Sequence, residues 1–439
     1  MSKTSKPKVY DKAKWDTSLG LDYSGWRTAK FGRPNYNGYV HSDFPPLFKN
    51  TKLISQYDLE GKGDGFQLAK QGNYVYFCHF NSSGLSVVDV SDLTKPEVVK
   101  FIPLDSPQMH GIKCRVLNDI LITSQEWKFF WAGPSAHAAG PEIPIQPGIK
   151  IYSLKDPADP KLLSFFPTGQ WTKEGGDLGN HRFWYDGHYA YLAAAMPGFD
   201  GNIMVNVDVS DPKNPKEVSK FWLPGQWTAG GERKSWIMGI HHPTVQGDRA
   251  YAGWFDLGPV IIDISNIKRP TLVWNAIYDK GGQNHTFLPI KDRKFAFFDS
   301  EYRYAWMLDI SDEKYPKIVG MFPKPPAELL KRGSGYTCGP SIHNIHENTP
   351  GPDSFRSDDI LYTACGPAGM RVYDMSDPYR IEEIGYYVPG TPKVYYDPRG
   401  PEHAEVGAGV DLAEVYVDKK GLLYCSSYNN GLEILEFTG

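Results

Sequence analysis

The stretch from Asn202 to Gly225, NIMVNVDVSDPKNPKEVSKFWLPG, decides the fold. An apolar run ends at Asp208, a Ser-Asp-Pro turn follows, and a second apolar run comes after it. Asp and Ser side chains accept hydrogen bonds from the local backbone and Pro fixes φ, so the pattern predicts two strands joined by a tight turn. The same unit begins again at Gly84, Gly148, Gly258, Ala305 and Gly369, and a truncated copy ends at Gly439.

A second hairpin precedes each of these units. The copy from Gly179 reads GNHRFWYDGHYAYL, in which an Asp-Gly turn separates two apolar runs, and the same frame returns from Gly239 and from Asn284. Two hairpins give four strands per repeat, which is the blade of a β-propeller. Seven copies predict an all-β fold, a seven-bladed β-propeller of four-stranded blades.

The last blade lacks its outer strand, and residues 51–61 (TKLISQYDLEG) have the pattern to supply it. The N-terminal strand would thereby close the ring and cover an open sheet edge. We therefore expect residues 51–439 to form one propeller. Residues 1–50 carry many aromatics without periodicity, and we expect an extended arm that packs on the propeller or links copies into a homo-oligomer.

The repeats VVDVSDLTKP, NVDVSDPKNP and IIDISNIKRP resemble those of LVIVD-repeat proteins. The resemblance extends over about residues 51–439. It implies a β-propeller, and it implies no particular reaction, because the motif is a strand and a turn.

Composition narrows the function classes. A net charge of −4 with interspersed acids and bases argues against a nucleic-acid or anionic-membrane partner. The N-terminus has no apolar segment of the kind found in signal peptides, and no run is long enough for a membrane helix. The five cysteines lack CxxC spacing, which favours a reducing, cytoplasmic location.

Long loops are expected on one face of the propeller, at the mouth of its central channel, and such loops usually build the binding site. They span residues 126–147, 169–178, 225–238, 324–340 and 390–410. Their aromatic side chains suggest a small apolar or aromatic substrate, although they could equally pack the loops onto the scaffold. The predicted substrate-binding residues are Trp127, Trp131, Trp171, Trp227, Trp236 and Arg182.

Histidines recur at the start of the first strand of successive blades. The predicted metal ligands are His110, His181, His241, His285 and His343, with Glu414 in the same slot of the seventh blade and Phe66 or Gln67 in the first. Because first strands line the channel, these imidazoles would converge on its axis, where they could bind a divalent transition metal: iron first, then zinc, manganese or copper. A slip of one residue would substitute His242 or His346. The alternative is that the rings bond water and backbone carbonyls.

The predicted catalytic acid–base residues are Glu414, Glu301 and His403. Glu126, Glu347, Glu402 and Glu405 also fall near the channel mouth. His188 falls in a turn on the opposite face, where no role beyond folding is expected.

The sequence therefore predicts a metal-dependent enzyme that acts on a small apolar or aromatic molecule. Iron or copper would favour an oxygenase or oxidase, whereas zinc or manganese would favour hydrolase or lyase chemistry through activated water. One histidine per blade resembles, in layout only, the iron site of carotenoid-cleavage oxygenases. The alternative function is a non-enzymatic scaffold that binds a protein partner on the long-loop face. No GxSxG, Walker A, GxGxxG or HExxH motif is present.

Overall fold

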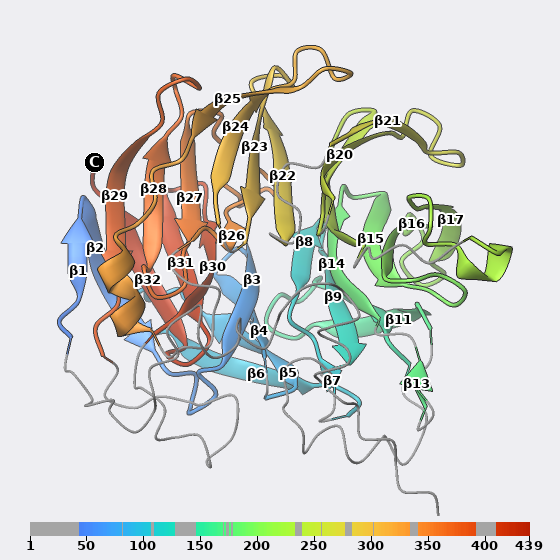
Figure 1. The fold of residues 1–439 in the computed structure, drawn as a ribbon. Helices are drawn as coiled ribbons and strands as arrows, with labels where there is room; N and C mark the ends of the chain where they lie inside the picture. The colour runs from blue at the N-terminus through green and yellow to red at the C-terminus, as the bar shows by residue number, and fades with distance from the viewer. Residues whose placement is uncertain are drawn as a thin grey trace, which may run out of the picture.

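The computed structural model consists of antiparallel sheets that follow one another around a ring in chain order (Figure 1). The structure describes residues 44–80, 82–106, 109–127, 146–169, 171–172, 175–176, 179–232, 239–255, 257–276, 283–301, 303–333, 341–391 and 410–439. Seven four-stranded blades are present, so the predicted all-β, seven-bladed propeller is confirmed. Most of the predicted arm lies outside the described residues.

The blades are numbered in chain order. Blade 1 contains β3 (Gly65–Gln71), β4 (Tyr74–His79), β5 (Gly84–Asp89) and β6 (Glu97–Pro103), and blade 2 contains β7 (Met109–His110), β8 (Cys114–Leu117), β9 (Ile120–Trp127), β10 (Gly148–Ser153) and β11 (Lys161–Pro167). Blade 3 contains β14 (Asn180–Tyr185), β15 (Tyr189–Ala195), β16 (Asn202–Asp208) and β17 (Lys216–Phe221), and blade 4 contains β18 (Ile240–Gln246), β19 (Arg249–Trp254), β20 (Gly258–Asp263) and β21 (Thr271–Asn275).

Blade 5 contains β22 (Asn284–Ile290), β23 (Phe295–Ser300), β24 (Ala305–Asp309) and β25 (Lys317–Met321). Blade 6 contains β26 (Asn344–Ile345), β27 (Ile360–Ala364), β28 (Met370–Asp374) and β29 (Glu382–Val388), with β1 (Leu47–Lys49) added at its outer edge. Blade 7 contains β30 (Leu412–Val417), β31 (Leu422–Ser427), β32 (Leu432–Phe437) and β2 (Thr51–Tyr57). The short elements β12 (Trp171–Thr172), β13 (Gly175–Gly176), η2 (Thr228–Gly230) and η3 (Ala327–Arg332) lie between blades in the chain.

The Ser-Asp-Pro turns form as their chemistry predicts. Between β16 and β17, the Asp208 carboxylate accepts a hydrogen bond from the Ser210 amide at 2.9 Å, and the Asp211 carboxylate accepts one from the Lys213 amide at 3.1 Å. The same local bonds recur in blade 4, where the Ser265 amide donates to Asp263 at 2.8 Å. Each turn is therefore specified by its own residues and fixes the register of the two strands beside it.

The hydrophobic core lies between neighbouring blades. One of its clusters joins blades 2 and 3 through Ile149, Phe183, Leu192 and Val205, all of which are buried. The third strand of blade 3, β16, is buried along nearly its whole length, while the outer strand β17 is half-exposed. Blades therefore stabilise one another face to face.

The ring closes as predicted. Strand β2 pairs antiparallel with β32, with Thr51 opposite Phe437 and Tyr57 opposite Leu432. Strand β1 extends the closure by pairing with β29 of blade 6. Residues from near the N-terminus thus complete blade 7 and extend blade 6, and the edge of β32 is covered.

Glu433 lies buried between blades 6 and 7, and it makes a pH-dependent contribution to stability. Its Oε1 accepts hydrogen bonds from the Tyr387 hydroxyl at 2.7 Å and from the Asn430 amide nitrogen at 3.2 Å, and burial raises the pKa of its carboxyl to about 7. The folded protein holds this proton up to about pH 7, whereas an unfolded glutamate loses it near pH 4.5. The contribution is therefore complete below pH 4.5 and is lost as the pH rises through 7.

We expect Glu433→Gln, which keeps the acceptor oxygen but cannot ionise, to abolish this part of the pH dependence. The wild-type free energy of unfolding should fall by about 3 kcal/mol more than that of the variant between pH 5 and pH 8. Denaturant titrations at the two pH values measure the difference, with Glu436→Gln, an exposed residue of the same strand, as the control. Parallel pH profiles for wild type and Glu433→Gln would contradict the assignment.

Within the described ranges, no helix has the length and apolar character required to cross a membrane.

Candidate metal centre at the propeller axis

The pairing of first and second strands aligns the seven blades at the channel. The second strands supply one reference residue per blade, in blade order Phe77, Thr123, Leu192, Ala252, Phe298, Thr363 and Cys425. What we call the ring position lies on the first strand, two residues before the residue that pairs with this reference. It is occupied by Phe66, Ile112, His181, His241, His285, His343 and Ala413, in blade order. Blades 3 to 6 therefore present four consecutive histidines, the histidine arc, and blades 7, 1 and 2 present an apolar arc.

A β-bulge re-aims the side chain at the ring position. The pairing of β14 with β15 shifts register between Asn180 and Phe183, and equivalent shifts flank His241 in β18 and His285 in β22. An unpaired residue in a bulged strand leaves the regular alternation of faces. The repeated bulge turns His181, His241 and His285, from distant parts of the chain, toward the axis, where His343 lies next to His285.

The rings of the histidine arc are in contact. His181 Nε2 lies 3.1 Å from His241 Nε2, and the rings of His241 and His285 are stacked with their centroids 3.4 Å apart. The centroids of His285 and His343 are 5.1 Å apart. The predicted ligands from blades 3 to 6 are thus brought together in one continuous array.

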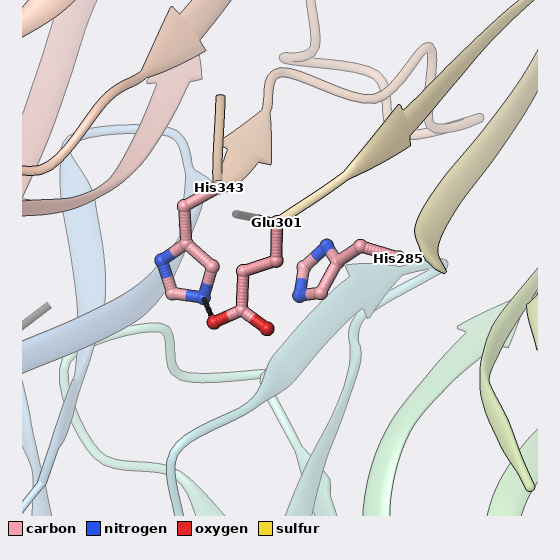
Figure 2. A group of neighbouring side chains, drawn as sticks. All are labelled: His285, Glu301 and His343. Carbon is pink, nitrogen blue, oxygen red and sulfur yellow. Dashed lines mark ion pairs between the residues drawn. The ribbon is translucent and has the colours of Figure 1, made fainter. Parts of the chain in front are cut away.

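Glu301, which follows β23, joins this array at its blade 5 and blade 6 end (Figure 2). His285, Glu301 and His343 each offer one ligand atom, and these three atoms lie within 4.8 Å of one another. Glu301 Oε1 lies 3.4 Å from His343 Nε2, and all three residues are buried. Of the predicted catalytic carboxylates, Glu301 is the one whose side chain faces the histidines.

Glu126, at the end of β9, binds the other end of the arc. Its Oε1 lies 3.0 Å from His181 Nδ1 and 2.9 Å from His110 Nε2. Burial alone would raise the pKa of Glu126, but the two histidines outweigh it and hold the pKa at about 2. The carboxylate is therefore ionised, and it connects His110 to the histidine arc. His110 lies two residues before the ring position of blade 2.

Burial keeps three rings of the arc uncharged. It lowers the pKa of His241, His285 and His343 well below the usual value, and the neighbouring histidines and Lys113 lower it further. A neutral imidazole has a lone pair free for a metal ion, so these rings are in the protonation state that ligation requires.

A second layer lies one residue further along each first strand: Gln67, Lys113, Arg182, His242, Thr286, Asn344 and Glu414. The sequence alignment put Glu414 in the ring; the strand pairing places Ala413 there and Glu414 in this second layer. Arg182 Nη1 lies 3.2 Å from Glu414 Oε2, and Arg182 Nη2 donates to Glu347 Oε1 at 2.6 Å. Arg115 pairs with the other oxygen of Glu347.

This second layer changes the expected role of Arg182. Its guanidinium is buried and occupied by Glu347, Glu414 and Asn344, so in this structure it serves an internal ion network and not a substrate. The sequence placed Glu347 near His343, but it contained no sign that the carboxylate would pair with arginines from blades 2 and 3.

The two substitute histidines are both engaged elsewhere. His242 uses both ring nitrogens, with Nδ1 2.7 Å from His241 Nδ1 and Nε2 2.8 Å from Glu347 Oε1. His346 accepts a hydrogen bond from the Val417 amide at 3.1 Å and donates to the Phe355 carbonyl at 2.9 Å. His346 therefore has a structural role, whereas His242 orients a ring residue.

The apolar arc belongs to a cluster of five buried side chains, in which Phe80 and Tyr428 join the three ring residues Phe66, Ile112 and Ala413. The cluster contacts His343, at one end of the histidine arc, and His110, which is joined to the other end through Glu126. The ring centroids of Phe66 and His343 are 5.9 Å apart, and those of Phe80 and His110 are 5.3 Å apart. Sequence reasoning noted Phe66 only as the residue filling a slot and missed the cluster.

The LVIVD repeat family matches three segments of the chain, residues 62–101, 181–222 and 244–277. The protein contains LVIVD repeats. The resemblance seen in the turn sequences is thereby confirmed. Of the histidine arc, only His181 lies within an LVIVD match, so the arc is not a feature of the repeat motif itself.

The LVIVD propeller is also similar to solved structures. One is the crystal structure of a functionally unknown protein from Desulfotomaculum acetoxidans DSM 771, at 11% sequence identity and a TM-score of 0.46, covering 79% of this chain and 88% of that one. Another is the computationally designed Ika8 protein, at 9% identity and a TM-score of 0.47, covering 87% and 98%. No curated protein matches the sequence significantly.

The remaining predicted residues of this LVIVD-repeat protein are less informative. Trp127 is buried at the end of β9, and Trp227 is exposed and packs against Trp222, with ring centroids 5.7 Å apart. Trp131, Trp236 and His403, and the side chain of Trp171, lie outside the described residues. Their predicted roles stay predictions.

Proposed function

We propose that this protein is a metal-dependent enzyme whose metal site is formed by the histidine arc at the propeller axis. The ligands in this proposal are His181, His241, His285 and His343, with Glu301 beside the last two. His110 and Glu126 hold the ring of His181 from behind, as carboxylates commonly do for ligand histidines.

The contact between His181 Nε2 and His241 Nε2 carries the proposal. The ionised Glu126 accepts the Nδ1 proton of His181, and in a neutral His181 the lone pair lies on Nε2, which faces His241. On the other side, Arg115 and Arg182 keep the pKa of Glu347 well below its usual value against the effect of burial, so Glu347 accepts the Nε2 proton of His242.

The chain of hydrogen bonds continues to His241. The pKa of His242 is lowered to about 3, mainly by burial, so its ring is neutral and its Nδ1 accepts the Nδ1 proton of His241. The Nε2 of His241 therefore carries a lone pair. When both rings are neutral, two lone pairs face each other across 3.1 Å, an arrangement that is stabilised by a cation.

Further donors lie beside this pair. His285 stacks on His241, and His285, Glu301 and His343 hold three more ligand atoms close together. A divalent transition metal here supplies Lewis acidity, and iron or copper also supplies redox chemistry. Imidazole suits iron, zinc and copper. We put iron first, followed by zinc, manganese or copper, because one histidine per blade resembles the layout of the iron site in carotenoid-cleavage oxygenases. Oxygenase or oxidase chemistry is therefore slightly ahead of hydrolase or lyase chemistry.

The substrate in this proposal is a small apolar or aromatic molecule. The apolar arc lies across the channel from the histidines, so an apolar group can pack there while its reactive atoms face the histidine side. We place the enzyme in the cytoplasm, a location supported by free, buried cysteines at positions 78, 114, 365 and 425.

Metal analysis of protein purified without an affinity tag or chelator tests the proposal. We expect one transition-metal ion per chain, and its identity divides the redox from the hydrolytic reactions. Traces of several metals, each far below one per chain, would contradict a metal centre. That result would favour the scaffold that binds a protein partner on the long-loop face.

A further inference from the structure

Lys113 presents a buried amine at the axis. The residue lies in the second layer, between β7 and β8, and its side chain is fully buried. Within the part of the chain that the structure describes, its Nζ makes no hydrogen bond and instead lies 3.8 Å from the centroid of the Phe66 ring. An amine buried without an acceptor is costly, which makes this side chain a feature that needs a partner.

The amine lies beside the candidate metal centre. Lys113 is near enough to lower the pKa of His241, His285 and His343. Burial, and then the charge of Arg182, lower the pKa of the amine itself well below its ordinary value. The four carboxylates around the axis pair with histidines or arginines, and none of them accepts a hydrogen bond from this amine.

Further aromatic side chains pack around Phe66 on the apolar side. Tyr428 meets Phe66 and Phe80 edge to face, with ring centroids 5.3 Å and 5.5 Å apart. These three side chains form an aromatic wall. A flat aromatic ligand packs well against it, because offset and edge-to-face contacts add to the burial of apolar area. The wall and the amine together recognise a ring that carries one polar atom.

We propose that Lys113 binds the hydroxyl oxygen of a phenolic substrate whose ring packs on Phe66, Phe80 and Tyr428. This deepens the proposed function by naming the substrate class, and the binding step itself needs no metal. The phenol O–H bond breaks as its proton passes to the amine, which gives a phenolate and an ammonium paired by a charge-assisted hydrogen bond.

A carboxylate is a poorer match than a phenol. Carboxylates in proteins are bound best by the planar fork of arginine, and the fork of Arg182 is already filled by Glu347, Glu414 and Asn344. Lysine provides a single donor atom, which suits the single oxygen of a phenol.

The test uses 4-nitrophenol, whose phenolate has its own visible absorption band, with the full-length protein. We expect the wild type to bind 4-nitrophenol and to show the phenolate band at a pH below the pKa of the free probe. Lys113→Met should bind it at least about tenfold more weakly and without that band, the loss expected for one charge-assisted hydrogen bond. Lys150→Met, which replaces another buried lysine of blade 2 that pairs with Asp105 instead, should bind like the wild type.

Nitrobenzene and 4-nitrobenzoate complete the experiment. Nitrobenzene lacks the acidic oxygen and should bind wild type and Lys113→Met equally weakly. Equal affinity of wild type and Lys113→Met for 4-nitrophenol, tighter binding of 4-nitrobenzoate, or no binding of 4-nitrophenol to the wild type would each overturn the inference. Circular dichroism of Lys113→Met separates loss of binding from loss of folding. Probe binding by a protein that retains no metal would support this inference and refute the metal centre, so the two can fail separately.

Discussion

Replacing His241 with glutamine should lower the affinity of the protein for its metal by at least about 100-fold. Substitutions that only disturb the partners of a ligand typically cost 10- to 100-fold, and loss of a ligand costs at least as much. His241 is the central residue of the arc, since its Nε2 faces His181 and its ring stacks on His285. Metal content after dialysis, measured by elemental analysis, should fall from one ion per chain to a small fraction.

Two other histidines provide controls for this prediction. His346→Gln changes a buried histidine that bonds to the backbone of β30 and to the Phe355 carbonyl, so it tests whether loss of any buried imidazole has the same effect. His188→Gln changes an exposed histidine in the turn between β14 and β15. Both should retain the metal. Full retention by His241→Gln would remove the arc from consideration as the ligand set.

Replacing Arg182 with methionine should reduce the free energy of unfolding by about 3–5 kcal/mol, the usual cost of removing one partner of a buried ion pair. The substitution leaves Glu414 without its ion-pair partner and Glu347 with only Arg115 and His242, and both carboxylates are buried. The carboxylates then remain in a low-dielectric environment without compensation. Chemical denaturation followed by tryptophan fluorescence measures the loss.

The matched control for this prediction is Arg380→Met. Arg380 pairs with Glu382 at 2.9 Å on the surface, where both side chains are largely exposed to solvent. Exposed pairs contribute little, so this variant should unfold like the wild type. If Arg182→Met proves as stable as Arg380→Met, the second layer does not stabilise the propeller, and Arg182 becomes available again as a substrate contact.

The propeller was predictable because its information is local. The Ser210 amide donates a hydrogen bond to Asp208 within their own turn, and a similar turn sequence recurs in the other repeats. The convergence of His181, His241 and His285 followed from this regularity, because three hairpins with equal spacing must present equivalent residues to the axis.

The contacts that define the site in detail were not predictable, because they depend on bulges and on packing between blades. A bulge in β30 puts Ala413 at the ring position and moves Glu414 next to Arg182. The contact of Lys113 with Phe66 joins blades 2 and 1, and its formation depends on how two sheets pack. Neither has a signature in residue spacing, which records only position along one strand.

Because β2 pairs with β32, the ring can close only after both strands have been synthesised. Ribosomes add about 5–20 residues per second, so synthesis of all 439 residues takes roughly 20–90 s. Throughout this time β2 has emerged but its partner has not, and once β32 appears its edge is bare until β2 docks. A second chain that is being translated from the same messenger RNA exposes an identical β2, which competes for this edge. The protein must therefore pair its own β2 and β32 before these strands pair with those of a neighbouring chain.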